Sequence, residues 1–217
     1  MDAFWPVMSL LPSTLVAVAF FSRNARKRWS LRRVRAELLG ALTSGADLGA
    51  IEQELAYLVA ELRPGLPSPH DPGAELRLLH AIAAMEQLDF EVARMRLDAT
   101  LAHGAEPWAR ARLALLRGQP DVSEPPGPAP VLLGEIGDDT RALFALAAAG
   151  ADEALLAHPR ALPTTRARLL AALGRNDEAL ATLATLAPAR LDALCRAFPA
   201  DPVVLLHARS LHATPYR

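Results

Sequence analysis

The chain has 217 residues, of which 52% are hydrophobic but only 5% aromatic. Most of the apolar content is Ala and Leu, which favour helices, whereas strands are rich in β-branched and aromatic residues. The single cysteine, Cys195, excludes an intramolecular disulfide and a cysteine-based zinc site. The composition therefore predicts an all-α protein, and its richness in Ala, Arg, Pro and Gly is typical of a GC-rich bacterial genome.

Charge is distributed unevenly along the chain. Residues 36–217 hold 16 basic and 23 acidic residues, a net charge of −7, which argues against nucleic-acid binding. Residues 22–35 hold seven basic residues and no acidic ones. They are Arg23, Arg26, Lys27, Arg28, Arg32, Arg33 and Arg35. The chain thus has a basic collar next to an acidic body.

An uncharged apolar stretch of eighteen residues, 4–21, precedes the basic collar. A membrane-spanning helix needs about 20 apolar residues, with a lower limit of about 17. The positive-inside rule keeps the basic side in the cytoplasm. The pattern predicts that residues 1–22 anchor the chain in a bacterial inner membrane, with the C-terminal domain in the cytoplasm and residues 4–21 in contact with the bilayer.

The predicted topology residues are aromatic side chains at the two interfaces and basic side chains on the cytoplasmic side. They are Trp5, Phe20, Phe21, Arg23, Arg26, Lys27, Arg28 and Trp29. Residues 23–35, a basic juxtamembrane segment, are also candidates for contact with anionic lipid headgroups. Two other interpretations stay open. Ala17-Val18-Ala19 resembles a signal-peptide cleavage site, although a basic segment before the apolar stretch is missing. Pro12 also fits a short helix buried in a soluble fold or a subunit interface.

Two proline-rich stretches, 63–73 and 118–130, interrupt an otherwise helical pattern and are expected to be exposed connectors. The predicted organisation places helical hairpins at 36–118, a linker at 119–130 and a second set of hairpins at 131–217. The first set contains two predicted helix pairs. Their ranges are 30–43 with 47–62, and 73–87 with 89–103.

Helix starts are marked by proline. Pro72, Pro107 and Pro202 each fall at an expected first helical position, and Asp71 and Asp201 precede two of them as caps.

Residues 142–156 and 166–180 share one pattern: an Ala/Leu-rich stretch, then Gly150 or Gly174, then Asp-Glu-Ala-Leu. The glycine is expected to take the left-handed conformation that ends a helix, and the aspartate, Asp177 in the second copy, to cap the next one. A looser copy occurs at 85–93. A hairpin of this kind cannot bury its own apolar face, so the hairpins are expected to stack.

The segment from Leu170 to Leu180 resembles the turn of a tetratricopeptide repeat, in which a Leu-Gly pair closes one helix and Asp-Glu-Ala opens the next. Pro188 falls where such a repeat usually ends, and the likeness is best over residues 142–188. The two copies lie 25 residues apart, against a family period of 34. The resemblance implies an α-solenoid of stacked antiparallel hairpins with a groove for a peptide or partner protein.

The chain contains no phosphate-binding loop, dinucleotide-binding glycine motif, serine-hydrolase elbow or zinc-binding histidine pair. His80, on an apolar helix face, is expected to be a core histidine. Cys195, beside Leu194 and Phe198, is expected to be a buried small hydrophobe. Arg166 and Arg168 are expected on a solvated face. We predict no catalytic residue, metal or cofactor.

Taken together, these features predict a membrane-tethered adaptor or scaffold that recruits a protein partner at the cytoplasmic face. One alternative is an accessory subunit of a larger membrane complex, whose N-terminal helix packs against other subunits. Another is an unfamiliar enzyme with a site between helices. A third is a soluble repeat protein whose first helix is buried.

Overall fold

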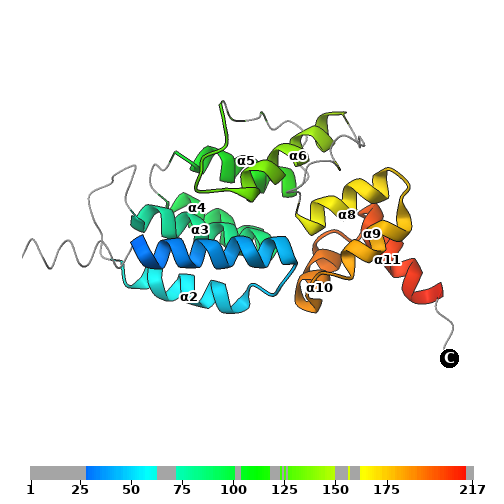
Figure 1. Cartoon of the computed structure of the whole chain (residues 1–217), viewed down its shortest axis with the longest axis horizontal. Helices are drawn as coiled ribbons and strands as arrows, with labels where there is room; N and C mark the ends of the chain where they lie inside the picture. The colour runs from blue at the N-terminus through cyan, green and yellow to red at the C-terminus, as the bar shows by residue number, and fades with distance from the viewer. Residues whose placement is uncertain are drawn as a thin grey trace, which may run out of the picture.

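The computed structural model describes residues 28–62, 72–100, 104–117, 123, 125, 127–149, 156 and 162–213. All regular structure in these ranges is helical, which confirms the predicted all-α class (Figure 1). The helices are residues 28–44, α2 (Gly49–Ala60), α3 (Pro72–Glu86), α4 (Phe90–Asp98), α5 (Glu106–Leu116), α6 (Glu135–Ala149), α8 (Pro163–Ala172), α9 (Asn176–Leu183), α10 (Pro188–Ala197) and α11 (Pro202–Ala213).

The first two hairpins form one block, with helix 28–44 and α2 packed on α3 and α4 (Figure 1). The two predicted helix pairs are therefore confirmed. One boundary was wrong, because α4 ends at Asp98 rather than at residue 103. The amide of Thr100 bonds the Leu97 carbonyl and its hydroxyl bonds the Arg96 carbonyl, which closes the last turn.

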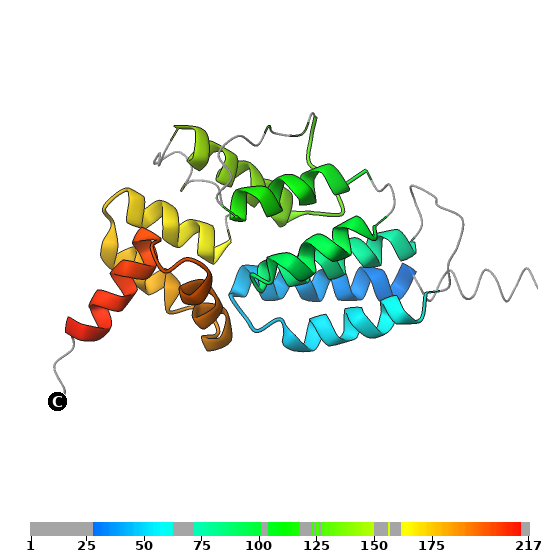
Figure 2. The same cartoon turned by 180° about the vertical axis from the view of Figure 1, so that it is seen from behind.

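Helix α3 is buried almost all round, with Leu76, Leu79, His80, Ala83 and Met85 in the first hydrophobic core. Neighbouring helices cover more than one of its faces, because α2, α4 and α5 all contact it. Its side chains therefore set the spacing of the block, and its C-terminal end points towards the second half of the chain (Figures 1 and 2).

The second block is built from α8 to α11 around a smaller core, which contains Ala167, Ala179, Leu183 and Leu194. Gly174 has φ +76°, so the predicted left-handed turn between α8 and α9 is confirmed. The predicted cap was wrong, because Arg175 is the N-cap of α9 and makes no side-chain cap bond. Asp177, the predicted cap, lies two residues after the N-cap, inside the first turn of α9, where its charge is favourable at the positive end of the helix dipole.

Three turns share one backbone pattern. At Gly45, Leu88 and Gly174 the chain takes positive φ, and the next amide bonds a carbonyl five residues back. This is the Schellman arrangement, which usually has glycine at the left-handed position. Leu88 is the exception, with φ 63°, and its side chain packs against the core of the second block.

Prolines begin the helices largely as predicted. Pro72 and Pro202 are first residues, and Asp201 accepts a hydrogen bond from the Val203 amide at 3.0 Å. Pro107 is the second residue of its helix rather than the first, because α5 already begins at Glu106 behind the N-cap Ala105. The hairpin α5–α6 lies along the top of both blocks in either view (Figures 1 and 2).

The predicted membrane segment lies outside the described residues. Within those ranges, no helix combines the length and the apolar character needed to cross a bilayer. Residues 28–35 of the basic collar form the first two turns of helix 28–44, where Leu31 and Val34 enter the first core. The collar is thus continuous with the helical body at that point.

Candidate functional site

A buried ionic network joins the two blocks. Arg112 of α5 is 2% exposed and donates to Glu86 of α3 at 2.6 Å and to Asp139 of α6 at 2.7 Å. It also donates to the Thr140 hydroxyl at 3.2 Å. One guanidinium therefore links three helices, and its planar fork is suited to holding two carboxylates at once.

Asp139 carries the network into the second block. Its side chain, 0% exposed, accepts from the Leu162 amide at 2.7 Å and from the Thr165 hydroxyl at 3.0 Å. These two donors lie at the N-cap and in the first turn of α8. With Arg112 they give the carboxylate three donors, so its burial is compensated by hydrogen bonds.

The network favours the charged form of Arg112, whereas burial raises the pKa of Asp139 against the opposing effects of Arg112 and the Leu162 amide. Burial alone would lower the pKa of Arg112, but the neighbouring Glu86 and Asp139 outweigh it and raise the pKa above its usual value. Removing the cation would leave two carboxylates buried beside each other, which is costly. The network therefore stabilises the meeting of α3, α5, α6 and α8.

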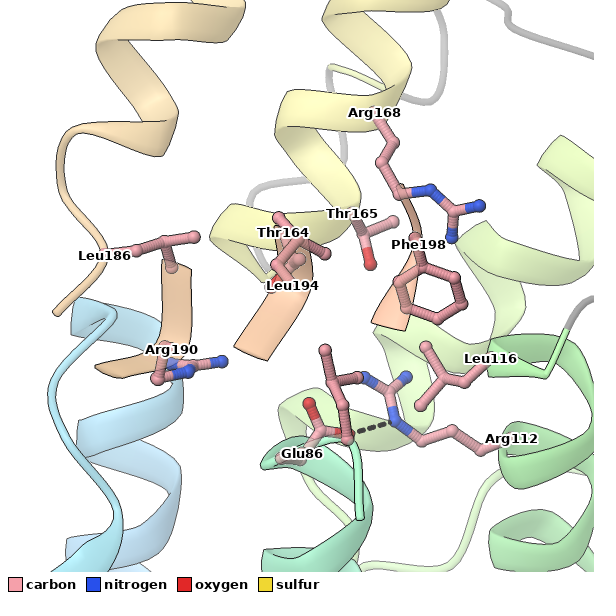
Figure 3. Close-up of a pocket in the computed structure, with 11 residues that line it drawn as sticks. Glu86, Arg112, Leu116, Thr164, Thr165, Arg168, Leu186, Arg190, Leu194 and Phe198 are labelled. Carbon is pink, nitrogen blue, oxygen red and sulfur yellow. Dashed lines mark hydrogen bonds and ion pairs between the residues drawn. The ribbon is translucent and has the colours of Figure 1, made fainter. Parts of the chain in front are cut away.

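A cavity of about 30 Å³ lies beside this network, between the two blocks (Figure 3). It has room for about two water-sized groups, because one such group needs about 10–15 Å³ of this volume. Its polar and charged wall is made by Glu86, Arg112, Thr164, Thr165, Arg168 and Arg190. Its apolar wall is made by Leu88, Leu116, Leu186, Leu194 and Phe198.

Arg190 of α10 is the unusual member of this wall. It is 6% exposed, and its Nη1 atom is buried without a hydrogen-bond partner. Burial lowers its pKa, while the charge of Glu86 opposes that effect. Figure 3 shows its side chain extending towards Glu86 and Arg112.

Arg168 closes another part of the wall. It pairs with Asp201 at 2.8 Å, and its guanidinium lies 5.8 Å from the ring centre of Phe198. The expectation that Arg168 lies on a solvated face was therefore wrong, because the packing of α11 on α8 brings an acid and a ring over it. Arg166, two residues earlier on the outer face of α8, is exposed as expected.

The predicted topology residues lie elsewhere. Trp29 is 66% exposed on helix 28–44, with the Arg33 guanidinium 5.5 Å from its ring centre, and Arg28 is exposed in the preceding position. Neither contributes to the cavity wall. Trp5, Phe20, Phe21, Arg23, Arg26 and Lys27 lie outside the described residues.

The other candidates behave as packing residues. His80 is 9% exposed in the first core, and burial lowers its pKa to about 4. Cys195 is half-buried against the second core, and burial raises the pKa of its thiol. Within the described ranges no three His, Cys, Asp or Glu side chains are grouped to hold a metal ion.

Sequence reasoning missed the network, although a signal was present. Asp139 lies three residues after Ile136 and four before Leu143, both buried, so it occupies the apolar stripe of its helix. Arg112 lies likewise between Trp108 and Leu116. A charged residue within an apolar stripe is almost never buried unless it is paired. The pairing could not be predicted from the sequence, because Glu86 and Asp139 lie 26 and 27 residues from Arg112.

Comparison of the chain with protein-family models, curated proteins and solved structures finds no match. The arrangement leaves a small cavity with cationic and hydroxyl groups in its wall.

Proposed function

We propose that the chain is a membrane-tethered adaptor that binds a protein partner at the cytoplasmic face of a bacterial inner membrane. The observation that carries the proposal is the exposure of Trp29, Tyr57, Leu205 and Leu211. The helices that carry them, helix 28–44 and α2 on one side and α11 on the other, lie at opposite ends of the molecule (Figure 1). One end holds the start of helix 28–44, which follows the predicted anchor, residues 4–21, in the chain. The other end is the last helix, α11.

The end next to the predicted anchor suits a membrane interface. Trp29 is 66% exposed and Tyr57, near the end of α2, is 65% exposed. Arg33 stacks on the Trp29 ring and forms an ion pair with Glu54 of α2. Glu54 lies one turn before Tyr57, so this ion pair connects the regions of the two exposed aromatic side chains. Trp and Tyr are enriched where protein meets the headgroup region.

The far end offers an apolar surface. On α11, Leu205 is 44% exposed and Leu211 is 63% exposed, while Val203 and Val204 face the core. These two leucines are the side chains that the proposed partner would cover. The resemblance of residues 142–188 to a tetratricopeptide repeat supports the same role.

The membrane part is tested by fractionation of the full chain. Leu11→Arg combined with Leu15→Arg places two charges in the apolar stretch, each costing about 3 kcal/mol for insertion at the centre of a helix. We expect the unaltered chain and a Leu11→Val/Leu15→Val control to need detergent for extraction, and the arginine variant to be released by carbonate. Extraction of all three by carbonate would refute the anchor.

The partner part is tested by site-specific photocrosslinking in intact cells. A crosslinking amino acid at Leu211 is expected to give one discrete adduct, and the same group at Asp177, exposed on α9, is expected to give none. Equal diffuse labelling from both positions would refute a specific partner surface on α11.

An accessory subunit of a larger membrane complex is the second candidate. The exposed leucines of α11 favour it as well, because a permanent subunit would keep them covered. In that case the adduct from Leu211 would migrate with a stable complex after detergent extraction, whereas an adaptor would be recovered largely as free chain without crosslinking.

A further inference from the structure

Arg190 is a buried cation whose Nη1 atom has no partner. Its side chain belongs to a residue that is only 6% exposed, and no carboxylate or other acceptor is hydrogen-bonded to Nη1. An arginine keeps its proton in proteins, so it cannot remove the cost of burial by becoming neutral. A hydrogen-bond acceptor next to the guanidinium would offset that cost.

The other arginines of the cavity wall are already engaged. Arg112 is bonded to Glu86 and Asp139, and Arg168 is paired with Asp201. Glu86, the carboxylate of the wall, has its Oε1 bonded to Arg112. Three of the four ionised groups that line the cavity are therefore guanidinium groups, and one of them has unused donors.

The first turn of α8 adds to the positive character of the same cavity. Thr164 and Thr165, which line it, are the second and third residues of the helix, and the N-cap Leu162 supplies no side-chain acceptor. Early amides of a helix lack intrahelical acceptors and form the positive end of the helix dipole. The Thr165 hydroxyl is taken by Asp139, so Thr164 is the hydroxyl left to a ligand.

We propose that this cavity is a binding site for the carboxylate group of a small ligand, with Arg190 as the cation that receives it. The room for about two water-sized groups matches the two oxygens of one carboxylate. One unpartnered guanidinium balances one negative charge, and its fork can bond both oxygens. The Thr164 side chain is placed to complete the coordination.

A carboxylate can come from a free small acid or from an acidic side chain of a peptide. Formate serves as the probe for the first source. A short peptide with blocked ends and a central glutamate, beside its glutamine counterpart, serves for the second. Binding of formate alone assigns the cavity to a free acid, and binding of the glutamate peptide but not the glutamine peptide shows that a side chain also enters.

The experiment measures melting temperature and calorimetric binding with the full chain in detergent, comparing sodium formate with sodium chloride at matched ionic strength. We expect formate to raise the melting temperature by about 3 °C at ten times its dissociation constant. Arg190→Met should weaken formate binding by about tenfold or more. Arg166→Met, the same change on the exposed face of α8, should leave it unchanged.

Arg190→Met should also melt at a higher temperature than the unaltered chain in chloride, because it removes a buried charge without a partner. If that variant fails to fold, Thr164→Val provides the second test and should weaken formate binding several-fold. The proposal is overturned if formate and the glutamate peptide give no more stabilisation than chloride, or if Arg190→Met binds formate as tightly as the unaltered chain.

Discussion

The amide of Ala187 donates a hydrogen bond of 2.7 Å to the carbonyl of Gly45, and this bond joins the turn after helix 28–44 to the start of α10. The two residues are far apart in the chain and belong to different blocks. Gly45 is buried at this contact with φ +75°, and a Cβ atom on it would lie 2.7 Å from the carbonyl oxygen of Thr185. The close approach of the blocks thus depends on a position without a side chain.

Gly45→Ala is expected to lower the free energy of unfolding by about 2–4 kcal/mol. The left-handed conformation costs about 1–2 kcal/mol for alanine, and relieving the clash with the Thr185 backbone adds to this. Urea denaturation measures the effect.

Gly174→Ala, with φ +76° and open space around it, should lose only about 1 kcal/mol. Gly40→Ala, exposed within helix 28–44, should gain about 0.5–1 kcal/mol. Equal effects at Gly45 and Gly174 would show that the contact adds nothing.

Arg112→Met is expected to destabilise the protein by about 3–5 kcal/mol. It leaves Glu86 and Asp139 buried, at 8% and 0% exposure, without their cation. The matched control is Arg110→Met on the same helix, whose side chain is 44% exposed and pairs with Glu106 and Asp98. Pairs of that kind contribute about 0–1 kcal/mol. Similar losses for the two variants in urea denaturation would mean that the buried network does not stabilise the junction.

Local signals allowed much of the fold to be predicted. Helix pairs, the glycine at 174 and the capping aspartate at 201 depend on neighbours within a few residues, and the structure has all of them. The turn at Leu88 was predicted from the looser copy at 85–93, but its left-handed conformation was not, because leucine normally avoids positive φ.

The site could be predicted only in outline. An ionic residue within an apolar stripe, such as Asp139, signals that a partner exists, but the partner is chosen by how helices from the two blocks meet. Arg190 gave a weaker signal, because α10 begins at Pro188 and only Leu194, four residues later, marks the buried face of the helix that Arg190 shares. Its burial follows from the placement of α10 against the first block, which no local pattern specifies.

Leu88→Gly is expected to be more stable than Leu88→Ala by about 1 kcal/mol, the reverse of the order seen inside helices. Both variants lose the same packing against the second core, but only glycine removes the strain of φ 63°. Urea denaturation of the two variants measures the difference directly. An alanine variant as stable as the glycine one would show that the turn relaxes to negative φ when the leucine is removed.

His80 is expected to make the protein less stable as the pH falls from about 6.5 to about 4. Burial, with a smaller effect from Arg96, lowers its pKa in the folded protein to about 4 from 6.5, while Glu52 opposes the shift. The unfolded chain therefore takes up a proton first, so the loss begins near pH 6.5, grows as the pH falls and reaches up to about 3 kcal/mol near pH 4. His80→Leu removes this titration and keeps the apolar packing of the first core. Urea denaturation at pH 7.5 and pH 5 should show a larger loss for the unaltered chain than for His80→Leu, because the carboxylates titrate in both. Equal losses in the two proteins would mean that His80 is already protonated or is solvated in the folded state.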